Sequence, residues 1–231
     1  LRALNFLEIC KRKTIYIGKD ELIVGERGPH PKAVSTFPEL TCHSVEDLHV
    51  LNTRELQRYT ISQEDIDTYE REVIPYWKGR TQRERIFNHV PKEWKEAYEA
   101  GMFTEFMEQR APGHTSLDGK VYQYGMLDLK ERIAHELRNL DFMNDPEATD
   151  KQEELTAMSI SCDAAIIFAE RHAELAEKMA GRETDPKRKK ELKKIAEICR
   201  WVPAHAPRTY WEAIQMYWFV HLGTITELNG W

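Results

Sequence analysis

The chain has 231 residues, of which 31% are charged and 41% hydrophobic, and its net charge of −6 gives no electrostatic reason to expect a nucleic-acid ligand. No apolar run approaches the roughly 18 residues that a membrane-spanning helix needs, and the first residues lack the pattern of a signal peptide. The four cysteines are widely separated and form no Cys-x-x-Cys pair, so we expect a protein of the reducing cytoplasm with no disulfide framework.

The first 43 residues are predicted to be a segment of strands and loops that follows a helix end within residues 1–13. Two β-rich runs, Thr14–Ile17 and Glu21–Val24, flank Gly18-Lys19-Asp20, which is typical of a β-hairpin. Residues 25–43 contain repeated glycine and proline and are predicted to be an irregular connection. The expected fold class is therefore mainly α with one short hairpin.

From Ser44 to residue 231 the pattern is helical. Ser44 is followed by acidic residues and is a good helix start, and Ser62-x-x-Asp65 resembles a capping box. The helix after Ser62 is predicted to end near Pro75, and two short amphipathic helices are predicted at 80–88 and 91–100.

The stretch 104–115 carries the strongest candidate for chemistry. Phe103, Phe106 and Met107 lie on two predicted helical turns, and Ala111-Pro112-Gly113 then ends the helix sharply. His114 is the first side chain beyond this break. Histidine can exchange a proton near neutral pH, so His114 is a candidate general acid or base. The alternative is a histidine that only caps the carbonyls of a helix end.

The remaining chain is predicted to be a short extended piece at 121–124 followed by helices at 126–140, 146–181 and 185–199. A last helix begins at Pro207 and is apolar nearly all round as far as Gly223. Such a helix belongs inside a larger body. We therefore expect the chain to be an internal piece of a longer protein.

Other candidate sites are weaker. Cys42, His43 and His49 lie close together, but without a second pair of ligands they predict no metal site. His221 and Glu227 flank Gly223, where they either reach a pocket or satisfy buried backbone groups. Nucleotide-binding glycine motifs and the His-Glu-x-x-His and Gly-x-Ser-x-Gly motifs are all absent.

Several segments together resemble the glycyl radical enzymes of the pyruvate formate-lyase superfamily. The main one is Glu108-Gln-Arg-Ala-Pro-Gly-His-Thr115. The others, in the same order as in the family, are Leu1–Leu4, Glu21–Glu26, Ala97–Met107, Val202–His205, and Ala213–His221 continuing to Thr226–Asn229. The resemblance covers essentially all 231 residues.

This resemblance implies that residues 1–231 are the N-terminal part of a pyruvate formate-lyase-like domain whose parent is an α/β protein, a ten-stranded barrel wrapped by helices. It implies a protein glycyl radical, installed by a partner activating enzyme that uses S-adenosylmethionine and an iron–sulfur cluster, and a cysteine thiyl made from that radical. None of the four cysteines lies in the family's Cys-x-Glu context, so none is given a radical role. The 231 residues alone are expected to be inactive and to bind no cofactor or metal.

The resemblance is greatest to members that dehydrate trans-4-hydroxy-L-proline to a pyrroline-5-carboxylate in anaerobic metabolism. It implies that His114 helps the hydroxyl group leave and that Phe106 packs on the substrate ring. An aspartate that follows the position of Trp231 in those members also lines the site, whereas Gly230 departs from their bulkier residue. The resemblance leaves room for a homodimer.

Alternative functions remain open at this stage. Within the class they are another glycyl radical eliminase, an arylacetate decarboxylase or a formate acetyltransferase-like enzyme. From another class, the alternative is a helical interaction domain that carries no chemistry.

Overall fold

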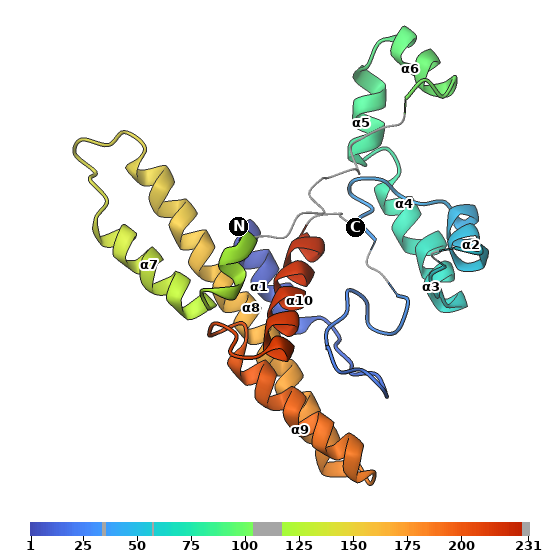
Figure 1. Cartoon of the computed structure of the whole chain (residues 1–231). Coiled ribbons are helices and arrows are strands. Elements are labelled where there is room, and N and C mark those ends of the chain that lie inside the picture. The colour runs from blue at the N-terminus through green and yellow to red at the C-terminus, as the bar shows by residue number, and fades with distance from the viewer. Residues whose placement is uncertain (34–35, 57, 104–116, 228–231) are drawn as a thin grey trace. The chain divides into compact units, whose positions relative to one another are not determined.

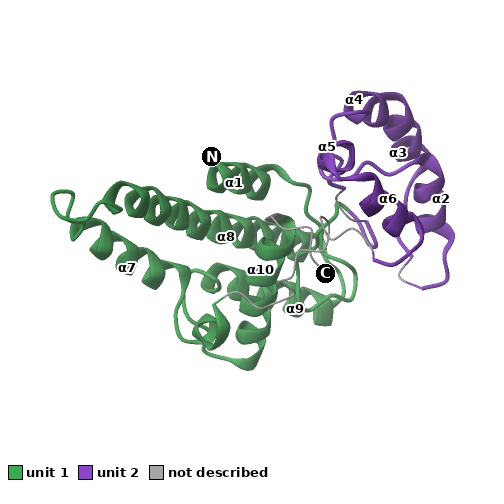
Figure 2. Cartoon of the chain, turned by 90° about the horizontal axis from the view of Figure 1, so that it is seen from above, with its two compact units in different colours: residues 1–29, 115–227 green, residues 30–114, 228–231 purple. Residues whose placement is uncertain are grey.

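The computed structural model describes residues 1–33, 36–56, 58–103 and 117–227. Every regular element in these ranges is a helix. The chain divides into two compact units, one of residues 1–29 and 115–227 and one of residues 30–114 and 228–231 (Figure 2). Each unit has its own hydrophobic core, so each is described by itself.

The first unit is built around one long helix, α8 (Ala148–Arg182), against which α1 (Arg2–Arg12), α7 (Met126–Arg138) and α9 (Pro186–Trp201) pack (Figure 1). The sequence explains why α9 lies so close along it. Helix α8 carries four buried alanines at spacings of four, three and four residues, namely Ala169, Ala173, Ala176 and Ala180. This spacing places them on one face of the helix. Their small side chains leave room for the buried side chains of α9, namely Leu192, Ile195, Ala196 and Cys199.

The long helices agree with their predicted ranges. The helices predicted at 126–140, 146–181 and 185–199 are α7, α8 and α9, and the Asp185 carboxylate caps α9 by accepting hydrogen bonds from the amides of Lys187 and Arg188. The last helix, α10 (Tyr210–Glu227), begins three residues later than the predicted start at Pro207. Its Met216, Phe219 and Leu222 are buried in the core of this unit.

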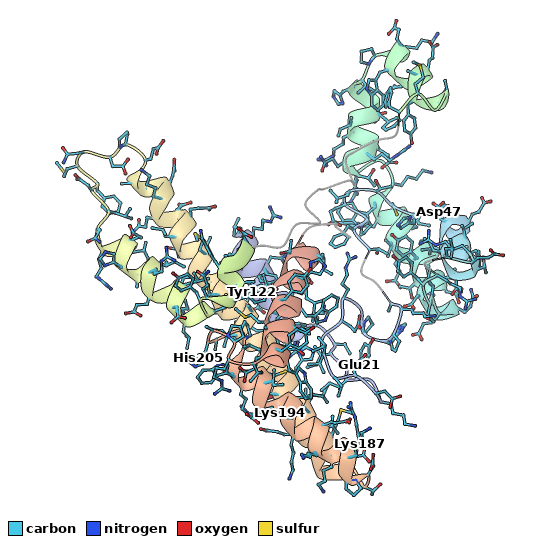
Figure 3. The ribbon with its side chains drawn as sticks, viewed as in Figure 1. Glu21, Asp47, Tyr122, Lys187, Lys194 and His205 are labelled. Atoms are coloured by element: carbon cyan, nitrogen blue, oxygen red, sulfur yellow. The ribbon has the colours of Figure 1, made fainter. Side chains whose placement is uncertain are left out.

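The predicted β-hairpin is wrong. Residues 14–27, named the strap here, contain no strand, although Ile17 and Val24 are buried as the β-rich pattern requires. Glu21 marks the strap in Figure 3. The strap does not pair with itself because side chains from two helices, α9 and α10, bind its backbone. A buried backbone group needs a hydrogen-bond partner, but that partner need not be another strand.

Helix α10 provides most of these partners. The amide of Gln215 binds both backbone groups of Val24, accepting from its N–H and donating to its C=O at 2.8 Å each. The indoles of Trp211 and Trp218 donate to the carbonyls of Leu22 and Gly25 at 2.9 and 2.8 Å. Positions 211, 215 and 218 lie on one face of a helix, so α10 replaces the missing second strand with a row of side chains.

An arginine of α9 binds two further carbonyls of the strap, and an arginine of α8 binds the chain just before the strap. Arg188 of α9 donates to the carbonyls of Gly18 and Glu21, each at 2.9 Å. Arg171 of α8 donates to the carbonyls of Cys10 and Lys13 at the end of α1. These guanidinium groups satisfy several carbonyls at once because arginine has five donors in a fixed plane.

The second unit is small and consists of short helices. They are α2 (Val45–Thr53), α3 (Gln63–Thr68), the π-helical turn η1 (Tyr69–Val73), α4 (Ile74–Trp77), α5 (Gln82–His89) and α6 (Lys92–Glu99). Its core is made by Leu48, Ile66 and Tyr69. Both predicted starts are confirmed, since Ser44 and Ser62 each form a complete capping box with Asp47 and Asp65.

The helix predicted to end near Pro75 continues to Trp77. Proline has no N–H and clashes with the preceding turn of an α-helix, so an uninterrupted α-helix through Pro75 would be strained. The π-helical turn Tyr69–Val73 directly before it widens the helix, and Pro75 lies in the first turn of the new segment α4. Within the described part of the chain, no helix is long and apolar enough to cross a membrane.

Candidate functional site

The two predicted site residues, His114 and Phe106, lie outside the described residues, as do Gly230 and Trp231. The structure describes the residues that flank the segments carrying these four residues, and we call these flanking residues the framework. They are the aromatic residues before residue 104, the turn after residue 116, and helix α10 before residue 228.

The chain enters the segment 104–116 from a cluster of aromatic rings in the second unit. The ring of Phe103 lies 4.7 Å from Trp94 and 6.2 Å from Tyr98, measured between centroids. Phe87 meets Trp94 and Tyr98 edge to face, and the guanidinium of Arg83 lies 4.2 Å from the Phe87 ring. Phe103, three positions before Phe106, is thus held by tilted contacts with two other rings.

The chain leaves this segment through a tight turn in the first unit. Leu117 and Asp118 are consecutive and both have positive φ, at 70° and 50°. Non-glycine residues avoid this left-handed region at a cost of about 1 kcal/mol or more each, with aspartate the better tolerated of the two. The turn continues as the 3₁₀-helix η2 (Asp118–Tyr122), so the prediction of an extended piece at 121–124 is wrong.

The core explains why η2 is not extended. Val121 is completely buried and packs with Met126, Met216 and Val220, so η2 contacts α10. The short helical turn directs Val121 inward and leaves Tyr122 half exposed. Tyr122 marks this turn in Figure 3.

The residues directly after η2 make a second set of contacts within the first unit. Gly125 lies against the backbone of the 202–205 segment, where a Cβ atom would come within 2.3 Å of the Ala204 carbonyl oxygen. The next two amides, of Met126 and Leu127, donate to the carbonyls of Pro203 and Ala204 at 2.8 and 3.0 Å. The Val-Pro-Ala-His motif at 202–205 therefore holds the start of α7, and with it the turn that follows His114.

A cleft of about 760 Å³ opens beside this turn in the first unit. Its lining is mostly apolar and comes from α1, α7, α8, α10 and η2 with Leu117. The apolar part includes Phe6, Ile133, Met158, Cys162, Phe219 and Val220. A few charged side chains, among them Glu136 and Glu154, also line the cleft, so it combines apolar contact with polar groups.

The cysteines do not fit a nucleophilic role. Cys10, Cys162 and Cys199 are buried, and none of the four cysteines forms a disulfide. Burial raises the pKa of Cys162 to about 11 and that of Cys199 to about 12, and burial also raises the pKa of Cys42. These thiols stay protonated at neutral pH and, within the described part, serve packing.

His221, the other candidate histidine, and His205 have structural surroundings. His205 stacks on Trp201 with centroids 4.3 Å apart. His221 lies between the rings of Tyr217 and Trp218, and its Nδ1 is buried without a hydrogen-bond partner in the described part of the chain. Over the described residues no three side chains of His, Cys, Asp or Glu converge as metal ligands, including those near Cys42.

Sequence reasoning missed an ion pair between a buried carboxylate and a half-exposed arginine. Glu212 on α10 is fully buried and accepts hydrogen bonds from the Arg208 guanidinium at 2.7 Å and its backbone amide at 2.6 Å. Burial alone would raise the pKa of Glu212, but these bonds outweigh it and lower the pKa. The Arg208 guanidinium also lies 3.8 Å from the Trp201 ring centroid, so the pair fixes the connection between α9 and α10.

Comparison with known proteins identifies the relatives of this framework. All 231 residues match the model of the pyruvate formate lyase-like family. Trans-4-hydroxy-L-proline dehydratase of Clostridioides difficile is 51% identical over the whole chain, and isethionate sulfite-lyase of Nitratidesulfovibrio vulgaris is 33% identical over 95% of it. The chain spans 29% and 28% of the lengths of these two relatives.

Solved structures of related enzymes match the same chain. The crystal structure of the Clostridioides difficile hydroxyproline dehydratase with trans-4-hydroxy-L-proline bound matches the whole chain with a TM-score of 0.87, over 29% of its own length. The glycerol-bound B12-independent glycerol dehydratase of Clostridium butyricum matches 99% of the chain with a TM-score of 0.81 and 32% identity, again over 29% of its length. The helical arrangement is therefore common to relatives that differ in substrate.

Proposed function

Because the chain belongs to the pyruvate formate lyase-like family, we propose that it is the N-terminal part of a glycyl radical lyase that dehydrates trans-4-hydroxy-L-proline. The observation that carries the substrate assignment is the 51% identity to the hydroxyproline dehydratase along the entire chain, against 33% for an isethionate lyase. The expected product is a pyrroline-5-carboxylate.

The radical step is assigned to residues outside these 231, because none of the four cysteines lies in the family's Cys-x-Glu context. In such an enzyme the glycyl radical, installed by the activating enzyme, provides removal and return of one substrate hydrogen atom. The net reaction converts hydroxyproline to the pyrroline carboxylate and one water molecule, so no external oxidant or reductant is consumed.

The part of this chain is proton transfer and substrate contact. Hydroxide is a poor leaving group, so the departing hydroxyl needs a proton, and His114 is proposed to donate it. The proton and the hydroxyl leave together as water. The ring of Phe106 is proposed to pack on the small saturated substrate ring, to which it offers apolar contact.

Substitution of His114 in the full-length enzyme tests this assignment. We expect His114→Ala to lower kcat by about 10²- to 10⁴-fold, as is usual for the loss of a general acid. The glycyl radical signal in electron paramagnetic resonance should remain at the wild-type level, because His114 has no part in activation. His135→Ala, which removes an exposed histidine on α7, is the matched control and should be active. Unchanged turnover by His114→Ala would refute the proton-donor role.

The substrate assignment has its own test. The activated full-length enzyme should release water from trans-4-hydroxy-L-proline and leave isethionate and glycerol unchanged. Turnover of isethionate or glycerol without turnover of hydroxyproline would overturn the assignment while leaving the family membership intact.

The proposed setting follows from the same assignment. The full-length protein is proposed to work in the cytoplasm, to require an activating enzyme of the S-adenosylmethionine and iron–sulfur type, and to form a homodimer. Coexpression with and without that activating enzyme, followed by measurement of the glycyl radical, tests the partner. Sedimentation of the full-length protein tests the dimer.

A further inference from the structure

The cleft of the first unit exposes an apolar stripe of helix α8. The residues of this stripe follow one another at spacings of three, four and three positions, so they lie on one face of the helix, and all of them line the cleft: Leu155, Met158, Cys162 and Ala165. Met158 is 50% exposed, and Leu155 is only half-buried. An apolar stripe on a helix normally packs against a second element.

The neighbouring helices pack beside this stripe without covering it. Helices α1 and α7 both contact α8 and lie on either side of it (Figure 2). Phe6, Ile133 and Phe219, from α1, α7 and α10, are each at most 8% exposed at the bottom of the cleft. These packed side chains leave a cleft of about 760 Å³, in which Met158 stays open to solvent.

The polar groups of the cleft do not converge on a small ligand. The hydroxyl groups of Ser161 and Thr224 donate to carbonyls of their own helices at 3.0 and 3.2 Å. The charged side chains among the described lining residues are exposed and carry both signs, namely Arg2, Lys120, Arg132, Glu136 and Glu154. A small-molecule site has a few polar groups placed around its apolar floor, whereas an apolar centre with a charged rim is typical of a contact between polypeptide surfaces.

The share of the relatives that this chain spans indicates what covers the cleft. The chain matches the hydroxyproline dehydratase along all of its residues but spans only 29% of that enzyme's length. Helix α10, which lines the cleft with Phe219 and Val220, is apolar nearly all round, as expected for a helix inside a larger body. A segment of the same polypeptide docks without the entropy cost of association, so a contact as small as this cleft suffices for it.

We infer that in the full-length protein this cleft is filled by an apolar segment of the polypeptide that follows residue 231. The inference rests on the proposed function, because it takes the chain as the N-terminal part of a longer enzyme. It assigns Met158 to the interior of the full-length protein and the charged rim to the edge of the contact.

Photo-cross-linking from position 158 identifies what covers the stripe. Met158 is replaced by p-benzoylphenylalanine in the full-length protein, which is then irradiated, digested and analysed by mass spectrometry. We expect a cross-link within one chain, from position 158 to a peptide that follows residue 231. The control is the same probe at position 143, because Met143 is 91% exposed and does not line the cleft. The peptide captured from position 158 should not be captured from position 143.

A pair of substitutions tests the burial of Met158 independently. Met158→Asp brings a charge into the contact, whereas Met158→Leu keeps an apolar side chain of similar size. In the full-length protein we expect amide hydrogen exchange around residue 158 to become at least about tenfold faster in Met158→Asp and to stay at the wild-type rate in Met158→Leu. If position 158 is open to solvent, Met158→Asp is a surface substitution and changes exchange by no more than about twofold.

The outcomes are distinct. A cross-link from position 158 to a second chain, solely to residues 1–231, or to no peptide would overturn the inference, as would equal exchange in Met158→Asp and Met158→Leu. If Met158→Asp does not fold, the cross-link decides. If His114→Ala keeps its turnover, the proton-donor proposal fails while a cross-link beyond residue 231 still supports the docking. If His114→Ala loses turnover and that cross-link is absent, the proposed function stands and only the docking is refuted.

Discussion

At the scale of single residues, the core of the first unit contains a histidine that must stay neutral. His172 on α8 is completely buried against the rings of Phe168 and Phe219, and its Nδ1 lies 2.8 Å from the Phe168 carbonyl. Its Nε2 has no hydrogen-bond partner among the described residues. Burial, reinforced by the positive charges of Arg171 and Lys13, lowers its pKa to about 4, although the bond to Phe168 opposes this.

This pKa predicts how stability depends on pH. The unfolded chain takes up a proton at His172 near pH 6.5, whereas the folded protein resists it until about pH 4. The contribution of His172 to stability is therefore fully present above pH 6.5 and is lost as pH falls towards 4, by about 3 kcal/mol in total. Urea unfolding of the full-length protein between pH 4 and 7 measures the slope.

The comparison with a variant isolates this one group. His172→Asn retains a donor for the Phe168 carbonyl but cannot be protonated, so its unfolding free energy should vary less with pH than that of wild type. His135→Asn, at an exposed position, should follow the wild-type curve. Parallel curves for wild type and His172→Asn would contradict the predicted role.

At the scale of elements, α10 binds the strap through side chains and not through a sheet. The central contact is the pair of buried hydrogen bonds between the Gln215 side chain and the backbone of Val24. In Gln215→Leu the amide and carbonyl of Val24 lose their partners, which should destabilise the first unit by about 2–4 kcal/mol. Chemical unfolding together with hydrogen exchange at the strap amides measures the effect.

An exposed glutamine provides the control for that prediction. Gln152 lies on the exposed face of α8, and Gln152→Leu should change stability by only a few tenths of a kcal/mol. If Gln215→Leu is as stable as Gln152→Leu, water or another side chain replaces the lost hydrogen bonds, and α10 is not what holds the strap.

At the scale of the whole molecule, two separate cores predict two separate responses to mutation. Leu48 is 3% exposed and lies in the core of the second unit, so Leu48→Ala should destabilise that unit by about 2–5 kcal/mol. Hydrogen exchange in the full-length protein should become faster in α2, α3 and η1 and stay unchanged in α8 and α9. Val50→Ala, on the same helix but 54% exposed, is the control.

Loss of protection throughout both units in Leu48→Ala would contradict this expectation, because it would mean that the two cores unfold together. One core can lose its contacts without an effect on the other core only if few interactions join the two cores.

The sequence by itself determined the elements whose causes are local. The capping boxes at Ser44 and Ser62, the aspartate cap of α9 and the apolar spacing of α7, α8 and α9 involve residues one to four positions apart, so their pattern is visible in the chain. The family and the candidate residues His114 and Phe106 were also predicted from sequence, by segments that follow one another in the same order as in the family. The roles of these two residues stay predictions.

Tertiary structure decided the features that depend on distant partners. The β-rich runs at 14–24 gave no hairpin, because Gln215, 191 positions after Val24, binds the backbone that a second strand would have bound. The extended piece predicted at 121–124 became a helical turn because Val121 is buried against α10. No local pattern reveals a left-handed leucine at position 117. A hydrogen bond or buried contact between distant residues outweighs the small conformational preferences of a short segment, so such segments adopt the backbone that their distant partners require.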